Sequence, residues 1–271
     1  MDLKKYTDAN REAWNEATLK HQEARAKKNN NLKEKIAQKG FSTLDKYETA
    51  KLNEIGLAGK KVAQVCCNNG QETLSLVNLG AESAVGFDIS DEAIKEAREL
   101  AEISGLNCEF VRTDIYDIGD EFKESFDLIF ITIGAMGWMP DLNKYFQVVS
   151  KMLRTGGHLA IYEHHPFCYM LACSDEDEFV QDDPLKIIYS YFRTDPWVGN
   201  DGIDYIGGTK YKAKTSYDFI QTLSTVINSI AGNSIRIKEF NEYSHDISLG
   251  FPEHAKEGKV PLSYILVGVK D

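Results

Sequence analysis

The chain has 271 residues, 42% of them hydrophobic, and a formal net charge of −11. A chain of this length buries roughly three quarters of the surface that its unfolded form exposes, so it can fold without a metal or a disulfide. The composition excludes disordered and fibrous proteins. The longest apolar run, Leu128 to Met139, is shorter than the ~20 residues of a membrane span, and no apolar leader follows Met1.

The charged and sulfur-containing residues narrow the class of protein further. Five cysteines, an odd number without Cys-x-x-Cys spacing, indicate reduced thiols rather than a disulfide framework or a zinc site. A basic stretch from Lys20 to Lys39 is interrupted by acids and is typical of a solvated helix face. We therefore expect a cytoplasmic protein that binds no metal, no membrane and no nucleic acid.

The first part of the chain alternates between strands and helices. Residues 1–56 are polar and helical in pattern and predict an N-terminal cap. The order that follows is strand 61–67, helix 72–80, strand 84–88, a helix from Ser90 to Ser104, strand 108–112, a short helix near Glu121, strand 126–133, helix 141–153 and strand 158–162. Apolar strands between helices are typical of a parallel sheet covered on both faces. The pattern predicts a Rossmann-like, doubly wound α/β domain over residues 57–271.

The alternation stops after the fifth strand. Residues 166–215 are rich in acids, glycines and aromatic residues and predict an insertion that forms a lid. A helix is expected over 217–231, followed by strands at 234–242 and 260–269. Because only a loop separates these last two strands, we expect them to form an antiparallel pair at the edge of the sheet.

Three polar positions follow the first three strands, where open parallel sheets bind ligands. The first turn holds Cys67, Asn68, Asn69 and Gly70, and both Asn and Gly tolerate the positive φ that a sharp turn requires. Asp88 ends the second strand, at a spacing suited to a ribose diol; alternatively, it only starts the helix at Ser90. Asp114 follows the third strand and is suited to an adenine amino group, or it is a simple turn residue.

These positions predict a nucleoside site. A dinucleotide needs a Gly-x-Gly-x-x-Gly loop against its pyrophosphate, and only Gly70 is present here. A cofactor without phosphates suits this loop better, which favours S-adenosylmethionine.

The order of the motifs resembles the class I S-adenosylmethionine-dependent methyltransferases, in a bacterial branch of undefined substrate. The resemblance rests on a first motif at 62–81, a ribose motif at 86–90, an adenine motif at 112–115, the fourth strand and its loop at 126–142, and the turn at 153–157. The first motif departs from the family, because Gln64 replaces an acid and Cys66 and Asn68 replace glycines.

Position by position, the resemblance implies the cofactor contacts. Cys67 to Gly70 would face the methionine end, and Asp88 would hold the ribose. Ile89, Asp114 and Ile115 would surround the adenine, and the backbone of Ile133 and Gly134 would lie near the sulfonium. Trp14 and His21 are placed to close over the cofactor, although a tryptophan on a helix is also typical of core packing.

Glu163, His164 and His165 follow one another at the end of the fifth strand. Histidine has an ordinary pKa of ~6.5, so we predict His164 or His165 as general base or acceptor contact, with Glu163 orienting it; alternatively, the pair only ends the strand. The expected function is methyl transfer to an O or N atom of a small molecule, by a monomer or homodimer. A non-catalytic binding or regulatory protein and a nicotinamide-dependent oxidoreductase are the alternatives.

Overall fold

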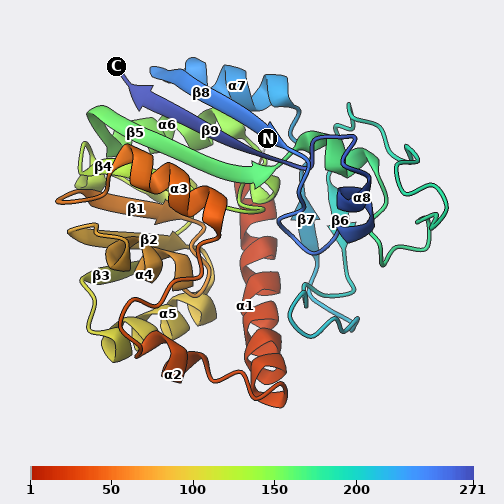
Figure 1. Ribbon diagram of the computed structural model, residues 1–271, viewed down its shortest axis with the longest axis horizontal. Coiled ribbons are helices and arrows are strands. Elements are labelled where there is room, and N and C mark those ends of the chain that lie inside the picture. Colours follow the sequence, from red (N-terminus) through yellow and green to blue (C-terminus); the bar gives the residue numbers. More distant parts are fainter. Residues whose placement is uncertain (1) are drawn as a thin grey trace.

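The computed structural model describes residues 2–271 and consists of a mixed sheet with helices on both faces (Figure 1). The strands are β1 (Lys61–Val65), β2 (Ser83–Asp88), β3 (Cys108–Arg112), β4 (Phe126–Ile131), β5 (Leu153–His164), β6 (Trp197–Gly199), β7 (Ser216–Asp218), β8 (Ile235–Tyr243) and β9 (Ser263–Lys270). The helices are α1 (Leu3–Lys27), α2 (Leu32–Ile36), α3 (Lys46–Ile55), α4 (Gln71–Asn78), α5 (Asp91–Ser104), α6 (Leu142–Met152), α7 (Leu223–Ala231) and α8 (Pro252–Glu257).

The main sheet confirms the predicted doubly wound fold. Its strand order is β3-β2-β1-β4-β5-β9-β8, with β1 to β5 parallel and β9 antiparallel to both β5 and β8. The winding reverses between β1 and β4, so the carboxyl ends of β1, β2 and β4 converge at the point where such sheets bind ligands. The predicted antiparallel edge pair is therefore present as β8 and β9.

The middle strand of the sheet, β4, is buried on both of its faces. Leu128, Ile129, Phe130 and Ile131 are each at most 2% exposed, so this strand has apolar side chains on both of its faces. Helices must cover both faces to keep that surface from water, and burial of each such side chain contributes about 1.5–3 kcal/mol.

Two expected element starts, at residues 158 and 217, differ most from the structure, whereas other bounds shift by a few residues. The strand predicted over 158–162 begins at Leu153 and includes Gly157, where a Cβ would lie 2.8 Å from the Arg154 carbonyl oxygen. In the sequence, the pair Gly156 and Gly157 indicates a turn. In the structure, Gly157 instead lets the backbone of β5 pass close to that of β4, where the pairing of the two strands is irregular between Phe126 and Leu128.

The helix predicted from residue 217 begins only at Leu223. Tyr217 lies in β7, which pairs with β6 outside the main sheet. Asn10 of α1 explains the difference, since its side chain accepts from the Tyr217 N–H at 2.7 Å and donates to the Tyr217 carbonyl at 2.9 Å. A side chain distant in sequence therefore holds this segment extended.

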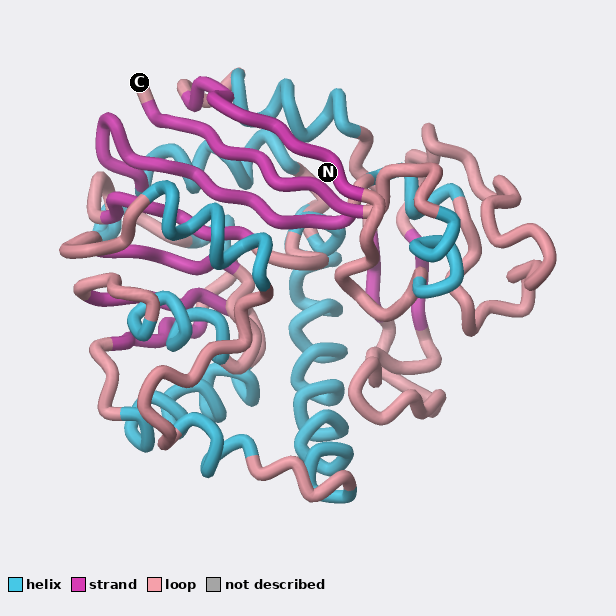
Figure 2. Tube along the Cα trace, in the orientation of Figure 1, coloured by secondary structure: helices cyan, strands magenta, loops and turns pink. Residues whose placement is uncertain are grey.

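The helix α1 stands between the carboxyl ends of the strands and the irregular segment that follows β5 (Figure 1). That segment is mostly loop around the short strands β6 and β7 (Figure 2). No helix among residues 2–271 has the length and apolar character that crossing a membrane requires.

Candidate functional site

A cavity of about 560 Å³ opens at the carboxyl ends of β1, β2 and β4, within the size range of small-molecule sites. Most of the sequence-predicted cofactor residues line it: Trp14, Cys67, Asn68, Asn69, Asp88, Ile89, Asp114, Ile115, Ile133 and Gly134. His164 of the predicted catalytic group lines it as well. Gly70, His21, Glu163 and His165 are not part of its wall.

The turn between β1 and α4 contributes residues 66–69 to the cavity wall and has an unusual backbone. Cys66, Asn68 and Gly70 all have positive φ, at 56°, 50° and 76°. At Gly70 a Cβ would lie 2.4 Å from the Phe110 ring, so only glycine fits there. The turn keeps its sharp shape although two of the family's glycines are absent, because Asn in particular tolerates this region.

Asp88 connects the turn to the next strand. Its carboxylate accepts from the backbone N–H of Asn68 and from that of Ser90, both at 2.8 Å. Burial raises the pKa of Asp88 to about 6, and those hydrogen bonds oppose the rise. The carboxylate is held rigidly at the cavity wall, in the charged state at neutral pH, and is suited to accept from a diol.

Asp114 lies at the neighbouring corner and already has two partners. One carboxylate oxygen accepts from the Tyr116 N–H at 3.1 Å, and the other accepts from the Lys4 ammonium at 2.9 Å. Ile89 and Ile115 provide apolar surface beside it. This corner fits a flat, apolar group with a polar edge, such as adenine.

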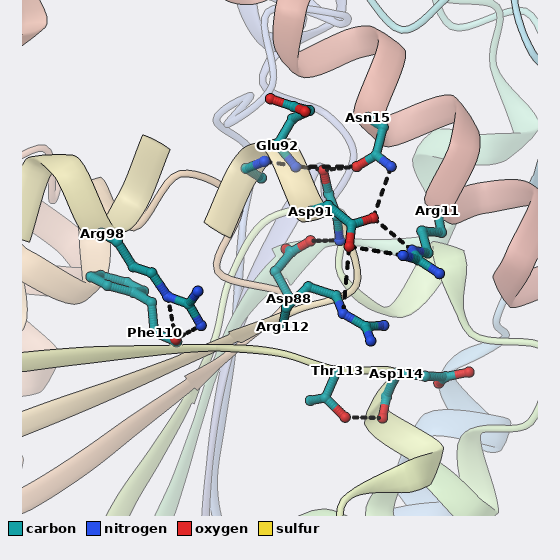
Figure 3. A network of polar contacts seen from close by, with 12 residues as sticks. Arg11, Asn15, Asp88, Asp91, Glu92, Arg98, Phe110, Arg112, Thr113 and Asp114 are labelled. Atoms are coloured by element: carbon teal, nitrogen blue, oxygen red, sulfur yellow. Dashed lines mark hydrogen bonds and ion pairs between the residues drawn. The ribbon is translucent and has the colours of Figure 1, made fainter. Parts of the chain in front are cut away.

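The helix α1 forms the wall opposite the strands with Thr7, Asn10 and Trp14. Figure 3 shows the contacts that hold it there: Arg11 reaches both carboxylate oxygens of Asp91, at 2.7 and 2.8 Å, and Asn15 donates to Asp91 at 3.0 Å. The Arg11 guanidinium lowers the pKa of Asp91 to about 2. The Trp14 ring meets Trp138 edge to face at 5.2 Å, so this tryptophan both lines the cavity and packs.

His21 lies further along α1 and contacts the insertion instead of the cavity. Its Nε2 is 2.7 Å from the Ile203 carbonyl oxygen, and its ring centroid is 4.3 Å from that of Tyr205. Burial lowers the pKa of His21. Because Ile203 and Tyr205 line the cavity, His21 acts on the site by holding those two residues in place.

The three predicted catalytic residues have three different surroundings. Glu163 is 4% exposed, and its carboxylate accepts from the backbone N–H groups of Gly134 at 2.5 Å and His164 at 2.9 Å. Burial raises the pKa of Glu163 to about 7. Glu163 thus anchors the loop after β4 rather than orienting a histidine ring.

His164 and His165 point in different directions. The Nε2 atom of His164 is buried without a hydrogen-bond partner among the described residues, and burial lowers the pKa of His164 to about 4. The Nε2 atom of His165 lies 3.0 Å from Glu242 of β8, and its Nδ1 accepts from the Phe167 N–H at 3.1 Å. Of the two rings, the structure brings only that of His164 to the cavity.

Several wall residues were not among the sequence-predicted site residues. Thr132, Trp138 and Met139 follow β4, Ile203 and Tyr205 come from the insertion, and Ile247, Ser248 and Leu249 come from the loop between β8 and β9. The abundance of aromatic residues in the insertion indicates that one of them could line the cavity, as Tyr205 does. The hydroxyl of Tyr205 is 3.1 Å from the Asn68 side chain. No comparable signal marked residues 247–249. Among residues 2–271, no group of three or more metal-ligating side chains gathers at one point.

Comparisons with known proteins agree with this architecture. Residues 57–194 match the family model described as "Methyltransferase domain". A phthiotriol/phenolphthiotriol dimycocerosates methyltransferase of Mycobacterium leprae is 32% identical over 42% of this chain and 41% of its own length. A ubiquinone biosynthesis O-methyltransferase of Aliivibrio fischeri is 29% identical over 44% of this chain and 52% of its own length. The chain therefore matches about half the length of these curated relatives.

Solved structures extend the likeness to most of the chain. An S-adenosylmethionine-dependent methyltransferase from Mesorhizobium loti superimposes with a TM-score of 0.57 and 19% identity, over 82% of this chain and 96% of that one. The chain belongs to the methyltransferase domain family. The resemblance to methyltransferases found in the sequence is thereby confirmed, and the solved structure shares the fold of the chain.

Proposed function

We propose that the protein transfers a methyl group from S-adenosylmethionine to an oxygen or nitrogen atom of a small molecule that binds against His164. The observation that carries the proposal is the single cavity that joins the β1–α4 turn, Asp88 and Asp114 to the ring of His164. When bound, the cofactor supplies a methyl group activated by its sulfonium. The protein then has to hold an acceptor in line with that methyl and exclude water.

The residues present fit this cofactor. Asp88 offers two fixed carboxylate oxygens to a ribose, and the corner of Ile89, Asp114 and Ile115 fits an adenine. Gly134 has open space within 4 Å of where a Cβ would be, so a ligand can approach the backbone after β4 closely. That backbone is held in place by Glu163 from β5.

His164 is suited to receive an acceptor hydroxyl or amine. Because its pKa is lowered to about 4, the ring is neutral at physiological pH and its free nitrogen accepts a hydrogen bond. The ring can thus orient the nucleophile. Because a base with a pKa of about 4 is weak, it takes the proton late, once the forming bond to the methyl group has made that proton strongly acidic. The name of the Aliivibrio fischeri relative, an O-methyltransferase, supports an oxygen acceptor.

The two alternatives from the sequence are less well supported. The family match does not favour a nicotinamide-dependent oxidoreductase. A non-catalytic protein was suggested by the altered first motif, but the turn retains its sharp shape, with positive φ at Cys66, Asn68 and Gly70. Absence of nucleic-acid partners, a cytoplasmic location, the domain limits at residues 56 and 215, and a monomeric or homodimeric state remain predictions.

Two measurements test the proposal. Calorimetry with S-adenosylhomocysteine is expected to show one site per chain. Labelled S-adenosylmethionine, offered with pools of phenols, alcohols and amines and with a small-molecule cell extract, is expected to pass its methyl to a small product. Binding without transfer to any pool would support the non-catalytic alternative, and failure to bind would contradict the proposal.

A further inference from the structure

A carboxylate in the first turn of α4 is fixed at the cavity wall by two side chains, one from β1 and one from the residue that follows β4. Glu72 Oε2 accepts from the Gln64 side-chain amide and from the Thr132 hydroxyl, both at 2.5 Å. The Gln64 oxygen in turn accepts from the Thr73 hydroxyl at 2.5 Å. Both hydrogen bonds to Glu72 end on the same oxygen, which leaves Oε1 available to a ligand.

A second buried carboxylate lies close to Glu72, with no cation to balance either. Glu48 of α3 is 4% exposed. Its Oε1 accepts from the Asp45 N–H at 2.7 Å, and its Oε2 has no partner among the described residues. Burial and the charge of Glu72 raise the pKa of Glu48 to about 8, and burial raises the pKa of Glu72.

The ion pairs of residues 2–271 include neither glutamate. No lysine or arginine lines the cavity in the described part of the chain. With a pKa of about 8, Glu48 is mostly protonated at neutral pH, so a negative charge on the pair lies on Glu72. A buried carboxylate without a counter-charge is costly, and a cationic ligand group at Glu72 would relieve that cost.

The strand order separates this carboxylate from the ribose position. β1 lies between β2 and β4. Asp88 therefore lies on the β2 side of the turn, whereas Glu72 lies on the β4 side, where it is bonded to Thr132. A ligand with a ribose at Asp88 would extend across the turn towards Glu72. S-adenosylmethionine carries an α-ammonium group at the end remote from its adenine.

We propose that Glu72 binds the α-ammonium group of the cofactor, so that recognition of the amino-acid end rests on a helix carboxylate held by Gln64 and Thr132. The inference builds on the proposed function, since it concerns the same cavity. The inference gives Glu72, which lies in α4 and not in β1 or the turn after it, a role in selecting the ligand. Gln64, which stands where the family has an acid, acts here as the residue that positions Glu72.

The test compares two ligands that differ only at the amino-acid end. S-adenosylhomocysteine carries the ammonium, and 5′-methylthioadenosine ends in a methyl group at the same sulfur. The Glu72→Gln variant is expected to weaken S-adenosylhomocysteine binding about 10- to 100-fold, as expected from the loss of a hydrogen bond to a charged group. It should leave the dissociation constant of 5′-methylthioadenosine unchanged. Glu92→Gln, in the first turn of the next helix and outside the cavity, is the matched control and should change neither.

Each outcome is decisive. A wild-type protein that binds neither ligand refutes the proposed function itself. A wild-type protein that binds both, with Glu72→Gln weakening both equally, gives Glu72 a purely structural role and overturns the inference. Unchanged S-adenosylhomocysteine binding in the variant also overturns it. Retained binding of 5′-methylthioadenosine shows that the variant is folded.

Discussion

The cofactor half and the acceptor half that we propose for the cavity are built in different ways. The cofactor half consists of strand ends, the turn after β1 and one face of α1, each fixed by hydrogen bonds such as those of Asp88 and Arg11. The acceptor half consists of His164 and of loop residues such as Tyr205 and Leu249, which are 57% and 85% exposed. A rigid half suits one constant cofactor, whereas a loop-built half can differ between proteins of one fold.

The sharpest test of the acceptor half is removal of the His164 ring. We expect His164→Ala to lower the turnover number by about 100- to 10,000-fold, because it removes the group that accepts the proton. The affinity for S-adenosylhomocysteine should stay within about twofold of the wild-type value, since the ring lies outside the predicted cofactor contacts.

The control for this variant is His158→Ala, on the same strand but outside the cavity, measured in the same labelled-methyl assay. Equal turnover in the two variants would show that His164 takes no part in the reaction. A loss of cofactor affinity in His164→Ala would mean that the two halves are not separate.

The corresponding test of the cofactor half is Asp88→Asn. The amide keeps the shape of the side chain but lacks the negative charge to which two backbone N–H groups and, in our proposal, the ribose hydroxyls donate hydrogen bonds. A hydrogen bond to a charged group contributes about 1.5–3 kcal/mol, so the dissociation constant of S-adenosylhomocysteine should rise about 10- to 100-fold in calorimetry. Asp120→Asn, on an exposed side chain, serves as the control. An unchanged affinity in Asp88→Asn would place the ribose elsewhere.

Acid should weaken cofactor binding through the same carboxylate. Burial raises the pKa of Asp88 from 3.8 to about 6 in the free protein, and the ionised form is the better acceptor for the ribose. Affinity for S-adenosylhomocysteine is therefore expected to be constant above about pH 7 and to fall as the pH drops through about 6. The Asp88→Asn variant should lose the part of this dependence that Asp88 causes, and a remaining dependence would come from Glu72, whose pKa burial also raises. A wild-type affinity that is flat between pH 5 and 8 would contradict the assignment.

The smallest expected effect concerns the attachment of α1 to α5. The side chains of Arg11 and Asp91 are 39% and 41% exposed, so their ion pair is screened by solvent. Arg11→Ala should lower the free energy of unfolding by only about 0.5–1 kcal/mol, measured by urea denaturation. Cofactor affinity should fall slightly because Trp14 loses support, and a loss of affinity as large as that of Asp88→Asn would show that α1 belongs to the binding site proper.

The same division explains what the sequence could predict. The sequence could predict that Asp88, Asp114 and the turn at 67–70 lie near one another, because each stands at the carboxyl end of a strand, and parallel strands bring these ends to one edge. Residues 203, 205 and 247–249 come from segments without a repeating pattern, and their approach to the cavity depends on distant contacts such as that of His21 with Ile203. Likewise, the pairing of Tyr217 with Asn10 overrode a helical pattern.

The sequence could not show which of the two histidine rings, that of His164 or that of His165, faces the cavity. His164 ends β5 and His165 follows it in extended backbone, so their side chains point in opposite directions. Which face holds the cavity is decided by the arrangement of the surrounding loops. Composition alone could not distinguish the ring with a free nitrogen from the ring beside Glu242.

A crystal structure with S-adenosylhomocysteine tests the central claim most directly. The account predicts the ribose on Asp88, the adenine between Ile89 and Ile115, and the thioether sulfur facing the His164 side of the cavity. A ligand bound outside this cavity, or one whose ribose avoids Asp88, would contradict it.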